Sequence, residues 1–125
     1  MIRSLLLVGS GGFLGSISRY LVSKFMQSTF PSAFPYGTFA VNIAGCFLIG
    51  LIYGISEKSS LITSEWRLFL AVGFCGGFTT FSTFASENLA LLRDGEFFNF
   101  FLYAGLSVLL GLAATFLGVL ITRIL

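Results

Sequence analysis

Long apolar stretches alternate with short polar connections along the whole chain. Charged residues are absent from residues 4–18, 27–56, 68–86 and 97–122. A bilayer core about 30 Å thick is crossed by a helix of about 20 apolar residues, and each stretch meets or approaches that length. The pattern therefore predicts an all-α integral membrane protein with four transmembrane helices.

Proline and polar residues between these stretches set the expected ends of the helices. Pro31, Pro35 and Gly37 favour a loop at the start of the second stretch. The first stretch could pass for a signal peptide, but it lacks a small-residue cleavage site, so a retained helix is favoured. We expect one membrane domain, residues 1–125, with both termini on the same side and helices at about 4–26, 37–56, 66–92 and 97–124.

The composition narrows the function classes. The chain is 56% hydrophobic and only 10% charged, whereas soluble domains carry about 25% charged residues. The net charge of +2 comes without a basic run, which argues against binding to nucleic acid. Histidine is absent, so the commonest general base and metal ligand are missing, and an enzyme is not expected. Four helices are too few to enclose a pathway alone, which favours an oligomer.

The two cysteines carry no sign of chemistry. Cys46 and Cys75 lie inside apolar stretches and lack the spacing of metal ligands. We expect them to behave as small buried hydrophobic residues.

Glycines recur four residues apart in three of the predicted helices. This spacing puts small residues on one helix face and lets two helices approach closely in lipid, where packing replaces the hydrophobic drive. We therefore expect helix contacts at the pairs Gly11/Gly15, Gly50/Gly54 and Gly73/Gly77.

The third predicted helix contains the string GFCGGFTTFSTF at residues 73–84. Adjacent glycines followed by two threonines at mid-membrane depth favour a break in the helix, and carbonyl groups freed by a break need partners inside the protein. A cation held by these carbonyls is one solution, as in transporters with broken helices. A kink packed on a neighbouring helix is the alternative, and the pattern alone favours neither.

Phe81 and Phe84 are three residues apart and so share a helix face. The edge of an aromatic ring is positive, so two rings turned edge-on can stabilise an anion without a fixed charge. The chain has 16 phenylalanines, however, and a lipid-facing position is the commoner one for any single ring.

Polar groups inside the second and fourth helices are further candidates. A buried amide must use its donors and acceptor, so Asn42 either donates to a passing anion or bridges two helices. Tyr103 and Ser107 lie one turn apart, and Gly111 and Thr115 continue the row. These hydroxyls either line a pathway or bond back to their own helix.

Arg19 and Glu87 are the most deeply placed charged residues. Charges embedded in a membrane are functional candidates by default. Both lie near a span end, so we expect a role in an aqueous vestibule or in packing.

Three sequence blocks together resemble the Fluc (CrcB-like) family of fluoride channels. The blocks are residues 12–20 (GFLGSISRY), 37–45 (GTFAVNIAG) and 73–84, of which the last is the most specific. The resemblance implies an antiparallel, dual-topology homodimer with two fluoride pores and one central, structural sodium ion. It also implies passive export of cytoplasmic fluoride across the inner (plasma) membrane, with the lipid bilayer and a second copy of the chain as partners.

The same resemblance assigns roles to individual residues. It implies that the ring edges of Phe81 and Phe84 contact fluoride and that Asn42 lines the pore. It implies that the backbone carbonyls of Gly76 and Thr79 hold the sodium ion. The remaining positions that it places along the pathway or in its vestibule are Ser82, Thr83, Tyr103, Ser107, Thr38 and Arg19.

The distribution of Lys and Arg agrees with dual topology. With four spans, four basic residues lie on the side of the termini and three on the other side. Membrane orientation follows this bias, so a difference of one leaves the two insertions close in free energy. The two groups are Arg3, Lys58, Arg67 and Arg123 against Arg19, Lys24 and Arg93.

Two other function classes remain as alternatives. A proton-coupled small multidrug transporter has about this size and four spans, but it needs a membrane-embedded acid in its first helix, and residues 4–26 contain no Asp or Glu. A structural subunit of a larger membrane complex would explain the glycine spacing, but not the string at residues 73–84.

Overall fold

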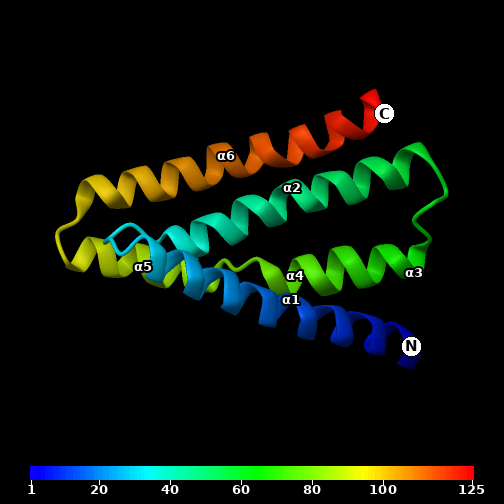
Figure 1. Ribbon diagram of the computed structural model, residues 1–125, viewed down its shortest axis with the longest axis horizontal. Helices are drawn as coiled ribbons and strands as arrows, with labels where there is room; N and C mark the ends of the chain where they lie inside the picture. Colours follow the sequence, from blue (N-terminus) through cyan, green and yellow to red (C-terminus); the bar gives the residue numbers. More distant parts are fainter.

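The computed structural model describes residues 1–125, which form a bundle of long helices lying side by side (Figure 1). Both termini lie at the same end of the bundle, as expected (Figure 1). The predicted number of spans is confirmed, and each span begins and ends within a few residues of its expected bounds. The helical stretches long and apolar enough to cross a membrane are α1 (Ile2–Thr29), α2 (Tyr36–Lys58), a third span (Ser64–Arg93) and α6 (Phe97–Ile124).

The third span is built from four successive elements. They are α3 (Ser64–Arg67), the π-helix η1 (Leu68–Cys75), α4 (Gly76–Phe78) and α5 (Ser82–Arg93). Residues 79–81, between α4 and α5, are not helical. Thr79 has an extended backbone, with φ −97° and ψ 159°. We refer to residues 79–81 as the interruption.

The helices pack as two pairs. α2 lies along α6, and α1 lies along η1 and α4 (Figure 1). α5 continues beyond the interruption and contacts the first part of α6. The interruption therefore sits between helices on both sides rather than at the end of the bundle.

Glycines bring both pairs to backbone contact. A Cβ atom added at Gly118 of α6 would lie 2.5 Å from the Phe47 carbonyl oxygen of α2. A Cβ atom added at Gly77 of α4 would lie 2.6 Å from the Gly12 carbonyl oxygen of α1. An added Cβ would also meet a neighbouring helix at every predicted pair, which confirms the expected contacts at Gly11/Gly15, Gly50/Gly54 and Gly73/Gly77.

The outer surface of the bundle is apolar. Only 22 of 125 residues are buried, and large side chains such as Phe13, Leu109 and Phe116 are exposed. Such a surface is stable against lipid tails, where water is absent and each helix satisfies its own backbone. The chain is a multi-pass membrane protein. Of its two free cysteines, Cys75 is buried in an apolar cluster and Cys46 is half-buried.

Candidate functional site

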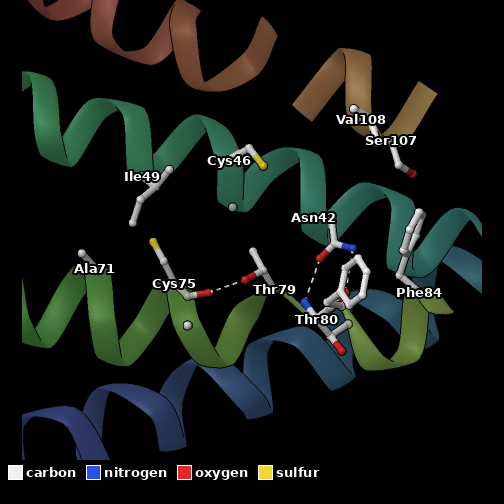
Figure 2. A pocket seen from close by; sticks show the side chains of 13 residues that line it. Asn42, Cys46, Ile49, Ala71, Cys75, Thr79, Thr80, Phe84, Ser107 and Val108 are labelled. Carbon is white, nitrogen blue, oxygen red and sulfur yellow. Dashed lines mark hydrogen bonds between the residues drawn. The ribbon is translucent and has the colours of Figure 1, made fainter. Parts of the chain in front are cut away.

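A hollow of about 420 Å³ opens beside the interruption, between α2, the third span and α6 (Figure 2). No charged side chain lines it. Of the eleven residues to which the family resemblance assigns roles, six meet at this hollow and the other five do not line it. The six are Asn42, Gly76, Thr79, Phe81, Phe84 and Ser107.

Asn42 of α2 holds the backbone of the interruption. Its Nδ2 donates to the Thr80 carbonyl at 3.0 Å, and its Oδ1 accepts from the Thr80 N–H at 2.8 Å (Figure 2). Asn42 therefore does bridge two elements, one of the two roles that the sequence left open. An amide NH2 carries two hydrogens, so one of them remains for a ligand.

Some other carbonyl groups near the interruption accept hydrogen bonds, whereas two do not. The Gly77 carbonyl accepts a hydrogen bond from Arg19 Nε at 3.0 Å. The Cys75 carbonyl accepts both the Thr79 N–H, at 3.0 Å, and the Thr79 hydroxyl, at 2.9 Å. By contrast, no turn, cap or side chain donates a hydrogen bond to the carbonyl of Gly76 or Thr79.

Phe81 and Phe84 lie next to each other at the start of α5. Their ring centroids are 5.7 Å apart, and the ring planes are inclined by 43°. Phe84 is half-buried and packs on Tyr103 at a centroid distance of 5.0 Å, whereas Phe81 is 78% exposed. The two rings therefore form one wall of the hollow. The Phe84 end of this wall is packed against Tyr103, and the Phe81 end is uncovered.

Thr38 and Tyr103 do not reach the hollow, because both hydroxyls are bound to Glu87. The Tyr103 hydroxyl donates to Glu87 Oε1 at 2.8 Å, and the Thr38 hydroxyl donates to Glu87 Oε2 at 3.0 Å. Tyr103 is fully buried and Thr38 nearly so. A membrane-embedded carboxylate needs donors, but these three residues lie on three different helices. No spacing in the sequence pairs them, so this cluster was missed.

Glu87 also lines a second hollow, of about 350 Å³, towards the end of the bundle opposite the termini. Asp94 and Glu96 line it as well. The hollow is acidic, and Arg19 does not line it. The structure therefore separates Glu87 from Arg19, for both of which the sequence predicts a role in a vestibule or in packing.

The row of hydroxyls expected on α6 is mixed. Ser107 lines the hollow, and its Oγ is buried and has no hydrogen-bond partner. Thr115 Oγ1, two turns further on, donates to the Gly111 carbonyl of its own helix and the Cys46 carbonyl of α2, both at 3.1 Å. Only Ser107 of these two is free to meet a ligand.

Ser82 and Thr83 do not line the hollow. Ser82 is exposed, and its Oγ lies 3.5 Å from Thr80 Oγ1. The Thr83 N–H donates to Thr80 Oγ1 at 3.2 Å. These two residues begin α5, immediately after the Phe81 ring.

Comparison with known proteins identifies the family. Residues 6–119 match the model of a family described as "CrcB-like protein, Camphor Resistance (CrcB)". The chain belongs to the CrcB-like family. It is 48% identical over 120 residues to the fluoride-specific ion channel FluC of Chlorobium luteolum, covering 96% of this chain and 92% of that protein. It is 44% identical over 121 residues to the protein of the same name from Flavobacterium psychrophilum, covering 97% and 98%.

These matches confirm the resemblance drawn from the three sequence blocks. They extend beyond the blocks, because residues 6–119 include most of α1 and α6 as well as the interruption. The CrcB-like membership therefore applies to the chain as a whole.

Proposed function

We propose that this chain is the subunit of a fluoride-selective channel through which cytoplasmic fluoride leaves the cell passively, down its electrochemical gradient. Relatives that match almost the whole chain are named fluoride-specific ion channels. The observation that carries the proposal is the meeting of Phe81, Phe84, Asn42 and Ser107 at one uncharged hollow.

The chemistry of this hollow suits a small, strongly hydrated anion. Removing fluoride from water is costly unless other donors replace the lost water molecules. The hollow is lined by Phe81 and Phe84, whose ring edges are positive, by Ser107 with its unpaired hydroxyl, and by Asn42 with its remaining N–H. A fixed cation would hold the ion too tightly for conduction, and weak donors avoid this.

A single chain leaves the hollow open to one side, where Phe81 is 78% exposed. In the proposed assembly a second copy, inserted in the opposite orientation, covers this side and completes an antiparallel homodimer with two pathways. The near balance of basic residues on the two sides supports dual insertion into the inner (plasma) membrane.

The donor set also suits a structural sodium ion at the dimer centre. Gly76 and Thr79 line the hollow, and their carbonyls accept no hydrogen bond from a turn, cap or side chain. Carbonyl oxygens are the ligands that hard cations prefer, and freed carbonyls at this depth need a partner. No group of three or more His, Cys, Asp or Glu side chains is arranged to hold a metal. When bound, the ion would supply positive potential near both pathways without standing in either.

Fluoride efflux from liposomes containing only this purified protein tests the channel. We expect rapid efflux, followed with a fluoride electrode, when a potassium ionophore balances the charge, and far slower efflux of chloride from matched liposomes. The rate should not change when a proton gradient is imposed or abolished. Absence of fluoride efflux from well-folded protein, or efflux that requires a proton gradient, would contradict the proposal.

A further inference from the structure

Two carbonyls are free where α4 ends because their helical donors are held by other groups. In a continuous helix, the Thr80 N–H would bond to the Gly76 carbonyl and the Thr83 N–H to the Thr79 carbonyl. Here the Thr80 N–H donates to Asn42 Oδ1 at 2.8 Å, and the Thr83 N–H donates to Thr80 Oγ1 at 3.2 Å. The second bond is the local hydroxyl-to-backbone contact by which threonine caps the start of a helix.

Arg19 binds the Gly77 carbonyl, which lies between Gly76 and Thr79 in the sequence. A continuous helix would join the Gly77 carbonyl to the Phe81 N–H. Instead this carbonyl accepts from Arg19 Nε at 3.0 Å. The only ion pair of the chain joins Arg3 and Glu65, so no carboxylate competes for the Arg19 guanidinium.

The position of Arg19 fits a structural contact rather than a charge in the pathway. It precedes the end of α1 at Thr29 by ten residues, about 15 Å of helix. A membrane-embedded arginine commonly pairs with backbone carbonyls. No residue of α1 lines the hollow at the interruption, so Arg19 holds α4 from the side away from that hollow.

We propose that Thr80 and Arg19 act together with Asn42 as positioning residues that keep the Gly76 and Thr79 carbonyls free to hold a cation. The inference rests on the proposed function, in which these carbonyls hold sodium. The Thr80 hydroxyl accepts the Thr83 N–H, which in a continuous helix would donate to the Thr79 carbonyl. Arg19 donates to the Gly77 carbonyl, which in a continuous helix would accept from the Phe81 N–H. When one of these two bonds is lost, helical hydrogen bonding extends into the interruption and sodium binds less tightly.

The test for Thr80 measures how sodium stabilises the purified protein. The midpoint of thermal unfolding is followed while sodium replaces N-methyl-D-glucamine, and fluoride efflux is measured on the same samples. Thr80→Val removes the hydroxyl and keeps the shape of the side chain, whereas Thr80→Ser keeps the hydroxyl as the matched control. We expect Thr80→Val to need about tenfold more sodium for half of the stabilisation, the scale of one lost hydrogen bond. Thr80→Ser should behave as the unsubstituted protein.

Three substitutions of Arg19 separate its donor from its charge. In Arg19→Gln an N–H donor stays the same number of bonds from Cα as Nε, while the charge is lost. Arg19→Met removes both, and Arg19→Lys keeps the charge without a donor at that position. We expect Gln to preserve the sodium dependence and both Met and Lys to shift it by about tenfold. Normal behaviour of Lys with loss in Gln would overturn the positioning role of Arg19. The Arg19 series decides the matter alone if Thr80→Val does not fold.

The outcomes distinguish this inference from the channel itself. Equal sodium dependence in the unsubstituted protein, Thr80→Val and Arg19→Met would overturn the inference and leave the fluoride channel intact. Fluoride efflux without any effect of sodium on stability would overturn both the sodium site and the inference. Loss of efflux in the unsubstituted protein would contradict the channel, while the sodium titration would still decide the positioning roles.

Discussion

The α2–α6 pair and the pair formed by α1 with the third span use the same close glycine contacts but satisfy their backbones differently. α2 and α6 run unbroken for 23 and 28 residues. Two side chains donate hydrogen bonds between them. Thr115 Oγ1 donates to the Cys46 carbonyl, which lies inside a helix that is already paired, and Lys58 Nζ caps the Thr122 carbonyl at the end of α6. In the third span, bonds from Arg19 and Asn42 replace hydrogen bonds that the backbone itself does not make.

The difference predicts where the chain is sensitive to substitution. Inside a membrane every backbone polar group needs a partner within the protein. An unbroken helix supplies these partners whatever its side chains are, so substitutions at the contact between α2 and α6 should act through packing and stability. The interrupted span depends on side chains such as Arg19 and Asn42 that bind its backbone, so substitutions of these side chains should change ion conduction.

The largest effect is expected from fixing the orientation of the chain. In our proposal, a copy inserted in the opposite orientation covers the open side of the hollow beside the interruption. Lysines added at the termini in one variant, and in the 26–36 connection in another, should lock each in a single orientation. Each variant alone should lose fluoride efflux from liposomes, and co-expression of the two should restore it. Full activity from either locked variant by itself would rule out the antiparallel dimer.

Asn42→Asp should come next, since a carboxylate cannot donate to the Thr80 carbonyl that lies 3.0 Å from Asn42 Nδ2. It would also place a negative charge beside the proposed pathway. We expect fluoride efflux to fall by about 100-fold or more, as for a loss of about 3 kcal/mol. Thr115→Val is the control in the α2–α6 pair and should leave efflux within about twofold of normal. Comparable losses in the two variants would remove the distinction between a side chain that binds the interruption and one at the contact between α2 and α6.

Phe81→Ile and Phe84→Ile should each lower fluoride efflux by about tenfold, because isoleucine keeps an apolar side chain but lacks the positive ring edge. Both variants should remain folded and dimeric by size-exclusion chromatography. Phe116→Ile is a matched control on the outer face of α6, where the ring is 63% exposed, and it should conduct normally. Normal efflux from both Phe81→Ile and Phe84→Ile would show that the rings only pack.

Much of this organisation could be predicted from local sequence patterns. Hydropathy and length gave the four spans, and four-residue spacing gave the glycine contacts between helices. A spacing of three residues was enough to bring Phe81 and Phe84 together. In each case the partners are close in the sequence or share one repeating helix face, so periodicity carries the information.

Contacts between different helices could not be predicted in the same way. The Glu87 carboxylate binds hydroxyls from α2 and α6, and no period of a single helix relates those positions. The string at residues 73–84 marked its region as unusual, but not that Asn42 and Arg19 would take its backbone groups. The sequence left two roles open for Asn42 for the same reason. A buried amide must form hydrogen bonds, but the sequence does not show with which groups.

The smallest effects are expected for glycine-to-alanine substitutions, which test packing in both pairs. A Cβ atom at Gly118 would press on the Phe47 carbonyl, and one at Gly77 would press on α1. Overpacking of this kind costs about 1–3 kcal/mol, so both variants should unfold at lower temperature in detergent. Gly105→Ala is the control, because a Cβ atom there would meet nothing within 4 Å. It should be neutral or slightly stabilising, since alanine favours a helix by about 1 kcal/mol over glycine.

The two destabilised variants should then differ in conduction. Gly118→Ala moves two continuous helices apart without freeing a backbone group, so fluoride efflux per folded dimer should stay near normal. Gly77→Ala moves α4 away from α1 and stretches the bond from Arg19 to the Gly77 carbonyl, so efflux should fall even after correction for the folded fraction. Efflux is measured in liposomes with protein that elutes as a dimer, which removes differences in folding yield. Equal efflux from the two variants would mean that the interrupted span tolerates displacement as well as the α2–α6 pair does. The structural difference between the two pairs would then have no consequence for conduction.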